Sequence, residues 1–224
     1  MQLKENEVID NLNIDDLKII QDNTGFKYGT DAVLLSKFAN VKKGARVLDL
    51  CTGSGIIPLL LCGLKEPSFV LGVEYFPEVS DMAKRSVLLN GLSEKIEILN
   101  EDVKNYKNYI EYNSFDHVTV NPPYKVLDTG FVNDNSYKTC ARHEVLLTLS
   151  DCVKAADYAL KFGGKLTMVN RIDRLSDVFY EFKINKIEPK RIAFPINSEG
   201  KGKIFVLEGI KGGKSGMTME ALFN

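Results

Sequence analysis

The chain has 224 residues, which is long for one domain and short for two, so we expect a single domain with residues 1–44 as an N-terminal cap and residues 45–224 as the core. Hydrophobic residues make up 44% of the sequence and charged residues 26%, a balance that excludes a disordered chain. The formal net charge of -1 gives no overall attraction to nucleic acid or to an anionic membrane. Met1–Asn11 lacks the apolar centre of a signal peptide and Ile56–Leu64, the longest apolar run, is too short to cross a bilayer, so we expect a soluble cytoplasmic protein.

Charge is distributed unevenly along the chain. Residues 1–16 carry five acids against one lysine, whereas residues 183–216 carry eight basic residues against three acids. A basic end of this kind can contact phosphates, but charge alone favours the simpler interpretation of a solvated surface. The four cysteines form no CxxC pair and have no histidine at metal-ligand spacing, so we expect reduced thiols and no metal at Cys51, Cys62, Cys140 and Cys152.

The predicted elements begin with a short strand at Leu17–Gln21 and a helix at Thr30–Asn40, for which Thr30 is the expected N-cap. From Ala45 onward, short β-branched runs alternate with amphipathic stretches. This alternation predicts, in chain order, strand Arg46–Leu50, helix Ile56–Lys65, strand Phe69–Glu74, helix Pro77–Asn90, strands Lys95–Leu99 and Phe115–Val120, helix Glu144–Phe162 stopped by Gly163-Gly164, strand Lys165–Asn170, a helix near Asp173–Phe182, and strands Lys186–Phe194 and Ile204–Ile210.

Strand–helix alternation implies a parallel sheet with helices on both faces. Nearly continuous apolar strands, such as Phe69–Val73, are typical of a sheet that is buried on both sides. The last two strands are joined by the Gly- and Lys-rich turn Asn197–Gly202, which indicates an antiparallel hairpin at one edge. We therefore predict an α/β fold with a seven-stranded, mainly parallel sheet, a C-terminal antiparallel hairpin and a short N-terminal extension.

A Gly-rich turn, Asp49–Gly55, directly follows the first strand of the core. In open parallel sheets, ligands bind beyond the carboxyl ends of the strands, and glycine lets the backbone approach a ligand closely. The same turn could serve a nicotinamide dinucleotide. However, Pro58 stands where the third glycine of that fingerprint would be, and Cys51 precedes the glycine pair.

Two acidic residues end the next two strands. Glu74 can accept hydrogen bonds from ribose hydroxyls, although a surface acid beside a helix start is the alternative. Asp102 can accept from an adenine amino group, and an N-cap for Val103–Ile110 is an equally good interpretation. Together with the Gly-rich turn, the two carboxylates favour an adenosine-bearing cofactor.

The motif Asn121-Pro122-Pro123-Tyr124 ends the fourth strand of the core and carries the predicted chemistry. The prolines make the loop rigid and leave carbonyl oxygens as acceptors, to which Asn121 adds an amide oxygen. Two such acceptors can hold an amino group with its lone pair aimed at a methyl donor, while Tyr124 stacks on a planar substrate. A plain turn after a strand is the alternative. The motif points to methylation of a planar amino nitrogen: adenine N6, cytosine N4, guanine N2 or a glutamine side chain.

The sequence resembles the class I S-adenosylmethionine methyltransferases and, within them, the bacterial tRNA (adenine-N6)-methyltransferases that modify adenine 37 of valine tRNA. The Tyr-Gly-Thr-Asp and Ala-Arg-His-Glu segments narrow the family, whereas Asn-Pro-Pro-Tyr alone does not. The resemblance implies a Rossmann-like fold, S-adenosylmethionine as cofactor and tRNA as substrate. It covers most of the chain, in Phe26–Leu35, Val47–Gly55, Asn121–Tyr124, Ala141–Glu144 and Leu207–Lys214.

The resemblance also implies roles for particular residues. The catalytic residues are then Asn121, Pro122, Pro123 and Tyr124. The cofactor is lined by Tyr28, Gly29, Thr30, Asp31, Asp49, Cys51, Gly53, Gly55, Glu74, Tyr75, Asp102, Val103 and Asn121. Three departures stand out: Cys51 replaces a glycine of many relatives, Asn170 replaces an expected histidine, and Met217–Asn224 is poorly matched.

Substrate contacts are expected from Tyr124, Arg142 and Arg171. We expect the polar segment Lys125–Cys140 to become ordered over substrate RNA, with phosphate contacts from the basic C-terminal hairpin. His117 lies on a predicted buried strand and is expected to be structural.

Three alternative functions remain at the level of sequence. Glutamine-N5 methylation of a release factor uses the same chemistry but normally comes with an N-terminal helical domain, for which the start of this chain is too short. Guanine-N2 methylation of rRNA is a second alternative, and an RNA-binding module that has kept the fold is a third. We expect a tRNA partner, no membrane and no metal; the sequence does not define the oligomeric state, for which we favour a monomer.

Overall fold

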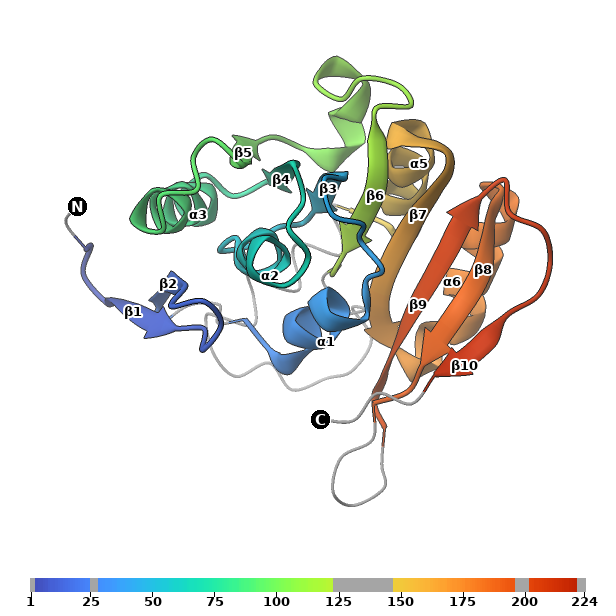
Figure 1. The fold of residues 1–224 in the computed structure, drawn as a ribbon, viewed down its shortest axis with the longest axis horizontal. Helices are drawn as coiled ribbons and strands as arrows, with labels where there is room; N and C mark the ends of the chain where they lie inside the picture. The colour runs from blue at the N-terminus through green and yellow to red at the C-terminus, as the bar shows by residue number, and fades with distance from the viewer. Residues whose placement is uncertain (1–2, 25–27, 123–146, 196–201, 221–224) are drawn as a thin grey trace.

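The computed structural model describes residues 3–24, 28–122, 147–195 and 202–220. Within these residues, a central sheet of eight strands is covered by helices on both faces (Figure 1). The elements, in chain order, are β1 (Glu7–Asn11), β2 (Lys18–Asp22), α1 (Thr30–Phe38), β3 (Arg46–Leu50), α2 (Ile56–Lys65), β4 (Phe69–Glu74), α3 (Pro77–Leu89), β5 (Ile96–Asn100), the 3-10 helix η1 (Val103–Asn108), β6 (Phe115–Val120), α5 (Leu149–Ala159), β7 (Leu160–Arg171), the 3-10 turn η2 (Ile172–Arg174), α6 (Leu175–Ile184), β8 (Ile187–Ala193), β9 (Ile204–Lys211) and β10 (Thr218–Glu220).

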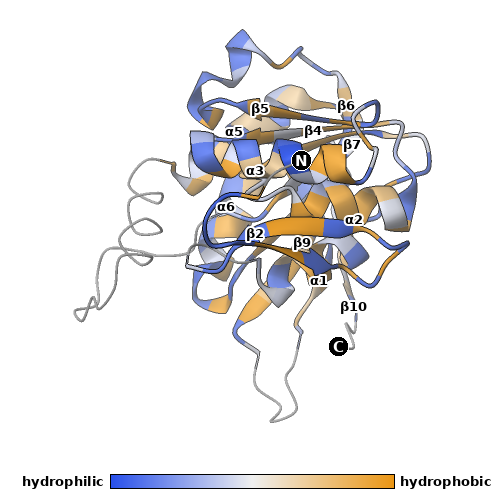
Figure 2. Cartoon of the chain, turned by 90° about the vertical axis from the view of Figure 1, so that its left-hand side faces the viewer, coloured by the Kyte–Doolittle hydropathy of each residue, from blue (hydrophilic) through white to orange (hydrophobic). Residues whose placement is uncertain are grey.

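Two apolar clusters hold the helices to the sheet because neighbouring strand residues point to opposite faces. On β3, Val47 packs with α1, α2 and α3, whereas Leu48 packs with α5 and α6. Helix α2 is apolar over most of its length, as its colour in Figure 2 shows, because it is packed between the sheet and α1. The α/β fold with a mainly parallel sheet, predicted from the alternating elements, is confirmed, and it agrees with the Rossmann-like fold that the resemblance implied.

The strand order across the sheet is β10-β8-β9-β7-β6-β3-β4-β5. The order in which the chain adds strands reverses beside β3. From β3 the chain continues through β4 to β5 on one side, and then returns to β6 on the other side of β3. Strands β3 to β7 are parallel, so the carboxyl ends of β3, β4 and β6 meet at one edge. In open sheets of this kind, the point of reversal is where a ligand binds.

The N-terminal residues form a two-stranded antiparallel hairpin, β1–β2, that packs on α3. The Asn90 side chain accepts a hydrogen bond from the backbone N–H of Lys18, and the Ser86 hydroxyl accepts one from that of Ile20. Helix α1 begins at Thr30, as predicted, but its N-cap is Gly29. The Thr30 cap was therefore wrong by one residue.

The boundary between α5 and β7 differs from the prediction. Helix α5 ends at Ala159 and β7 already begins at Leu160, so Gly163-Gly164 lies within the strand and does not stop the helix. The register of β6 against β7 shifts between Phe115 and His117, which marks a bulge at the glycine pair. Gly163 has φ +79° there, a conformation that glycine adopts at low cost.

The sheet has one strand more than the seven predicted, counted over the described residues. Strand β10 pairs in parallel with β8 beyond the C-terminal hairpin and forms the edge. A three-residue strand has too short a pattern to be recognised in a sequence. The division into residues 1–44 and 45–224 stays a prediction. Among the helices of the described residues, none has the length and apolar character needed to span a membrane.

Candidate active site

The predicted catalytic motif begins at the sheet edge where the chain reverses. Leu50 pairs with Val120, so Cys51 and Asn121, which follow them, leave neighbouring strands at the same edge. Asn121 is half-buried and Pro122 is buried. Pro123 and Tyr124 lie outside the described residues. The described half of the motif therefore lies beside the Gly-rich turn.

Asp49, the last but one residue of β3, is hydrogen-bonded to the Gly-rich turn and to β6. Its two carboxylate oxygens accept hydrogen bonds from the hydroxyls of Thr52 and Thr119, at 2.6 Å each, and the residue is fully buried. Burial raises the pKa of Asp49 to about 7, since desolvation disfavours the charged form and outweighs the two hydroxyl hydrogen bonds. The geometry supports a role in holding the turn, and direct contact with a cofactor stays a prediction.

Glu74, at the end of β4, joins its own loop to the Gly-rich turn. One carboxylate oxygen accepts from the backbone N–H of Gly53 at 2.9 Å, and the other accepts from that of Phe76 at 3.0 Å. Burial raises the pKa of Glu74, although backbone hydrogen bonds from Phe76, Gly53 and Tyr75 oppose the shift. Each carboxylate oxygen can accept a second hydrogen bond, so the group retains capacity for ribose hydroxyls.

Cys51 begins the turn with φ +61°, in the left-handed region that favours glycine. This conformation is the one in which the glycine implied by the family resemblance would be unstrained. A hydrogen bond with the Cys152 thiol of α5 and burial raise the pKa of the Cys51 thiol. Cys51, Cys62 and Cys152 are free thiols, as expected; Cys140 lies outside the described residues. The turn is thus tied to α5 as well as to β4.

Tyr75 and Asp102 flank Glu74 at the edge. Tyr75 is 46% exposed, and its ring lies nearly perpendicular to that of Phe76 with the ring centroids 5.1 Å apart, so part of the Tyr75 side chain is available to a flat ligand. Asp102 accepts from the backbone N–H of Lys104 and is the N-cap of η1, which confirms one of its two interpretations. Val103 is buried behind it. Asn100, which the sequence did not single out, donates to the backbone carbonyls of Glu74 and Tyr75 and so fixes their loop.

Buried hydroxyls test whether this edge fits a polar ligand. Among the described residues, Ser54 of the turn and Ser80 in the first turn of α3 have buried hydroxyl oxygens without a hydrogen-bond partner. Buried hydroxyl groups usually have a hydrogen-bond partner in a folded protein, because a buried polar group without one costs about 1–3 kcal/mol. With the spare acceptors of Glu74 and the exposed part of Tyr75, these serines fit a cofactor that carries an adenosine.

The segment Tyr28, Gly29, Thr30 and Asp31 lies at the start of α1. Lys165, near the amino end of the parallel part of β7, donates to the backbone carbonyl of Asn40 just after α1. Because the end of α1 lies at the amino edge of the sheet, its start faces the carboxyl edge. The structure thus brings this segment to the same edge as the Gly-rich turn.

The predicted basic hairpin does not form one open cationic surface in the described residues. Arg191 forms ion pairs with Glu208 and Glu220, and Lys211 donates to the backbone carbonyls that end α5. His117 is fully buried and hydrogen-bonds to Thr167 at 2.8 Å, so its predicted structural role is confirmed. Phosphate contacts from the whole hairpin are therefore not supported.

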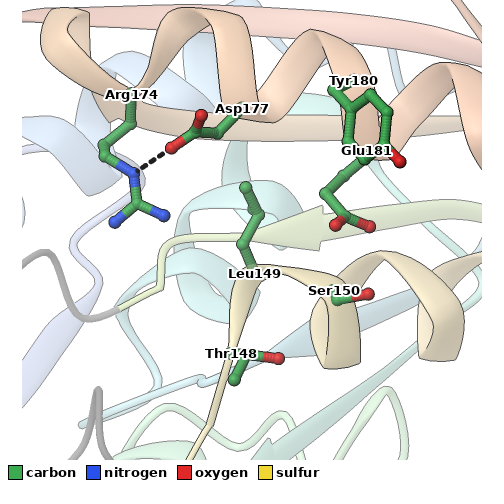
Figure 3. A pocket seen from close by; sticks show the side chains of 7 residues that line it. All are labelled: Thr148, Leu149, Ser150, Arg174, Asp177, Tyr180 and Glu181. Carbon is green, nitrogen blue, oxygen red and sulfur yellow. Dashed lines mark hydrogen bonds and ion pairs between the residues drawn. The ribbon is translucent and has the colours of Figure 1, made fainter.

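Arginines instead lie at the carboxyl end of β7. Arg171 pairs with Asp173, and Arg174 pairs with Asp177 at 2.8 Å. Beside Arg174, a cavity of about 290 Å³ opens between the first turns of α5 and α6. Figure 3 shows the Arg174–Asp177 pair at one end of this cavity and Tyr180 at the other. Arg142 and residues 125–140 lie outside the described residues, so their predicted roles stay predictions.

Known proteins resemble this chain in sequence and in fold. Residues 23–178 match the family described as methyltransferase small domain. A tRNA1(Val) (adenine(37)-N6)-methyltransferase of Bacteroides thetaiotaomicron is 31% identical over 196 residues, which cover 80% of this chain and 81% of that relative. The enzyme of the same name from Histophilus somni is 30% identical over 152 residues, and these cover 67% of this chain but only 63% of that relative.

A solved structure shows the same fold. Geranyl diphosphate C-methyltransferase from Streptomyces coelicolor, in complex with Mg2+, geranyl diphosphate and S-adenosyl-L-homocysteine, is 10% identical with a TM-score of 0.61 over 81% of this chain and 77% of that one. Together with the match over residues 23–178, these findings assign the fold, the enzyme class and the cofactor. The chain belongs to the methyltransferase small domain family and is an S-adenosylmethionine-dependent methyltransferase.

Proposed function

We propose that this chain methylates N6 of an adenine in tRNA, adenine 37 of valine tRNA. The observation that carries the proposal is the position of Asn121-Pro122 at the end of β6, next to the turn that follows β3. The relatives from Bacteroides thetaiotaomicron and Histophilus somni, which carry the name of that activity, support the choice of nucleotide.

The described residues support a cofactor position across the ends of β3, β4 and β5. Glu74 accepts from the ribose hydroxyls, Tyr75 packs on the adenine ring, and the backbone between Cys51 and Gly55 contacts the methionine portion. The start of α1 closes the other side of the pocket. Bound there, S-adenosylmethionine would supply an electrophilic methyl group; transfer to the amino nitrogen would break its carbon–sulfur bond and release one proton.

Asn121 and Pro122 act on the target amino group. Its two N–H bonds donate to the Asn121 amide oxygen and to the Pro122 carbonyl oxygen, which removes the lone pair from conjugation with the ring and aims it at the methyl group. The same acceptors stabilise the positive charge that develops on nitrogen. The described carboxylates at this edge, Asp49, Glu74 and Asp102, accept hydrogen bonds from neighbouring hydroxyl or backbone N–H groups, so Asn121 and Pro122 act by orientation and charge stabilisation.

Substrate RNA approaches from the side of β7. Arg171 is exposed at the end of that strand, and we assign it a phosphate contact; its pairing with exposed Asp173 contributes little and can be exchanged for an RNA phosphate. The target base has to leave its stack to reach Asn121, as in other enzymes that modify bases.

The test is methyl transfer to total RNA from a strain that lacks the protein, followed by identification of the methylated nucleoside by mass spectrometry. N6-methyladenosine in valine tRNA is the expected product. N2-methylguanosine in rRNA, or methylglutamine in a release factor, would contradict the proposal. The absence of any S-adenosylmethionine binding in calorimetry would favour a non-catalytic module.

A variant of Asn121 distinguishes its effect on the substrate amino group from an effect on cofactor binding. Asn121→Ala should lower kcat by about 100- to 1000-fold, because it removes an acceptor that acts on developing charge. The affinity for S-adenosylmethionine, measured by calorimetry, should stay within about twofold of the wild-type value, because the loss falls on the transition state. A collapse of cofactor binding in this variant would place Asn121 in the cofactor pocket and not on the substrate.

A further inference from the structure

Gln21 is a buried polar side chain of the N-terminal hairpin. Its exposed fraction is only 3%, although it belongs to a small sheet that lies outside the central one. Strand β2 runs from Lys18, beside the end of α3, toward Asp22, so Gln21 lies near the carboxyl edge of the central sheet. A buried amide is retained at low cost only when its donor and its acceptor are both used.

Both ends of the Gln21 amide have partners. The side-chain N–H donates to the Asp10 carboxylate at 2.5 Å, and the amide oxygen accepts from the backbone N–H of Tyr28 at 3.1 Å. A carboxylate can only accept, so Asp10 determines which end of the amide faces it. Asp10 thereby aims the oxygen of Gln21 at Tyr28.

The hairpin that carries Gln21 is fixed to the helix that follows Glu74. Arg85 of α3 forms a two-pronged ion pair with Glu7, whose side chain is 6% exposed. The Ser86 hydroxyl accepts from the backbone N–H of Ile20, the neighbour of Gln21. Gln21 is therefore held in place relative to α3, and the bond to Tyr28 passes this position on to the start of α1.

We propose that Gln21 is a positioning residue for the cofactor, acting through Tyr28 on the Tyr28–Asp31 segment. The inference rests on the proposed function, in which this segment closes the cofactor pocket. Tyr28 itself is half-buried, and burial together with the Asp10 charge raises the pKa of its phenol. The hydrogen bond fixes one backbone group of the segment before the cofactor arrives, which lowers the ordering cost of binding.

Three variants test the inference through the affinity for S-adenosylmethionine, measured by calorimetry, and through kcat and KM. Gln21→Leu should raise Kd and the KM for the cofactor about tenfold, because it leaves the Tyr28 N–H and Asp10 without their partner. Gln21→Glu should act similarly, since it opposes two carboxylates. In Gln21→Glu combined with Asp10→Asn, the donor and acceptor exchange places, and affinity should return to within about twofold of the wild-type value.

The matched control is Glu208→Gln, which breaks a buried ion pair with Arg191 in the other half of the sheet without touching the N-terminal hairpin or Gln21. It should lower Tm and leave Kd unchanged, whereas the Gln21 variants should change Kd and KM with kcat nearly constant. Normal cofactor affinity in Gln21→Leu, or a failure of the double variant to recover, would overturn the inference. If Gln21→Leu does not fold, the comparison of Gln21→Glu with the double variant decides. Wild-type protein that binds no S-adenosylmethionine would instead overturn the proposed function.

Discussion

Buried carboxylates in the two halves of the sheet have opposite electrostatic surroundings. At the β3–β4 edge, Asp49 and Glu74 receive hydrogen bonds from hydroxyl and backbone N–H donors, and burial raises the pKa of both. In the C-terminal half, Glu208 is 1% exposed but lies against Arg191 at 2.8 Å and Lys165 at 3.7 Å. Its pKa is lowered, because these cations and its hydrogen bonds outweigh the effect of burial.

This difference in pKa indicates a structural role for Glu208 and a functional role for the carboxylates at the β3–β4 edge. Arg191 connects Glu208 to Glu220 of β10 and to the backbone carbonyl of Phe38, so the compensated carboxylate joins the sheet to the end of α1. Among the described residues, no cation contributes to the pKa of either edge carboxylate, so their burial is opposed only by hydrogen bonds from hydroxyl and backbone N–H groups. Uncompensated buried acids are common where a ligand or a reaction requires them. Variants of these carboxylates test whether the two halves of the sheet differ in this way.

The largest effect on stability is expected from Glu208→Gln. This variant removes the charge that compensates Arg191 and Lys165, and breaking a buried ion pair costs about 3–5 kcal/mol in unfolding free energy. Urea denaturation followed by circular dichroism measures the change. Cofactor affinity should be unaffected in the folded variant. A loss below about 1 kcal/mol would show that the pair behaves as an exposed one.

The pH dependence of stability should distinguish Asp49 from other acids. An acid whose pKa rises from 3.8 to about 7 on folding keeps its proton in the folded state while the unfolded chain releases it. The contribution of Asp49 to the unfolding free energy is therefore greatest below pH 4. It decreases as the pH rises toward 7 and does not change further above pH 7. Against Asp49→Asn, wild-type protein should lose on the order of 4 kcal/mol over that range. A difference that does not vary with pH would show that Asp49 is ionised throughout.

His117 is an internal control for the sign of this effect. Burial lowers its pKa from 6.5 to about 4, so the folded state releases a proton that the unfolded chain keeps between these values. Stability from this group rises with pH over the range in which that from Asp49 falls. The comparison of Asp49→Asn with wild type cancels the His117 contribution, because both proteins contain it.

Glu74→Gln should act on binding with little effect on stability. The amide cannot accept from the N–H groups of Gly53 and Phe76 and serve the ribose as well as a carboxylate does. Loss of a charged hydrogen-bond acceptor is expected to weaken binding of S-adenosylmethionine about 10- to 30-fold, as calorimetry would show. Glu208→Gln is the matched control, since it makes the same chemical change in the other half. Equal losses of affinity in both variants would remove the distinction between the halves.

The sequence predicted the parallel core well because hydrophobic pattern and turn residues are local properties. Strands β3, β4 and β6 and helix α2 have the predicted bounds. Strand β10 was missed because it depends on a long-range pair, Glu220 with Arg191. The residues at the site edge were identified from strand ends, but Thr119, Asn100 and Gln21 were not, because each acts on a residue that only the fold brings near it.

The smallest expected effect concerns Cys51, which has a left-handed backbone conformation at the start of the Gly-rich turn. Cys51→Gly relieves the cost of φ +61° for a residue with a side chain, but it adds backbone entropy to the unfolded chain and removes the contact with Cys152. These contributions nearly cancel, so the unfolding free energy should change by less than about 1 kcal/mol. Cys51→Val is the contrasting variant, because a β-branched side chain is strained in this conformation. The valine variant should unfold at a lower urea concentration than Cys51→Gly. If valine is tolerated as well as glycine, the left-handed conformation of Cys51 is not imposed by the Gly-rich turn.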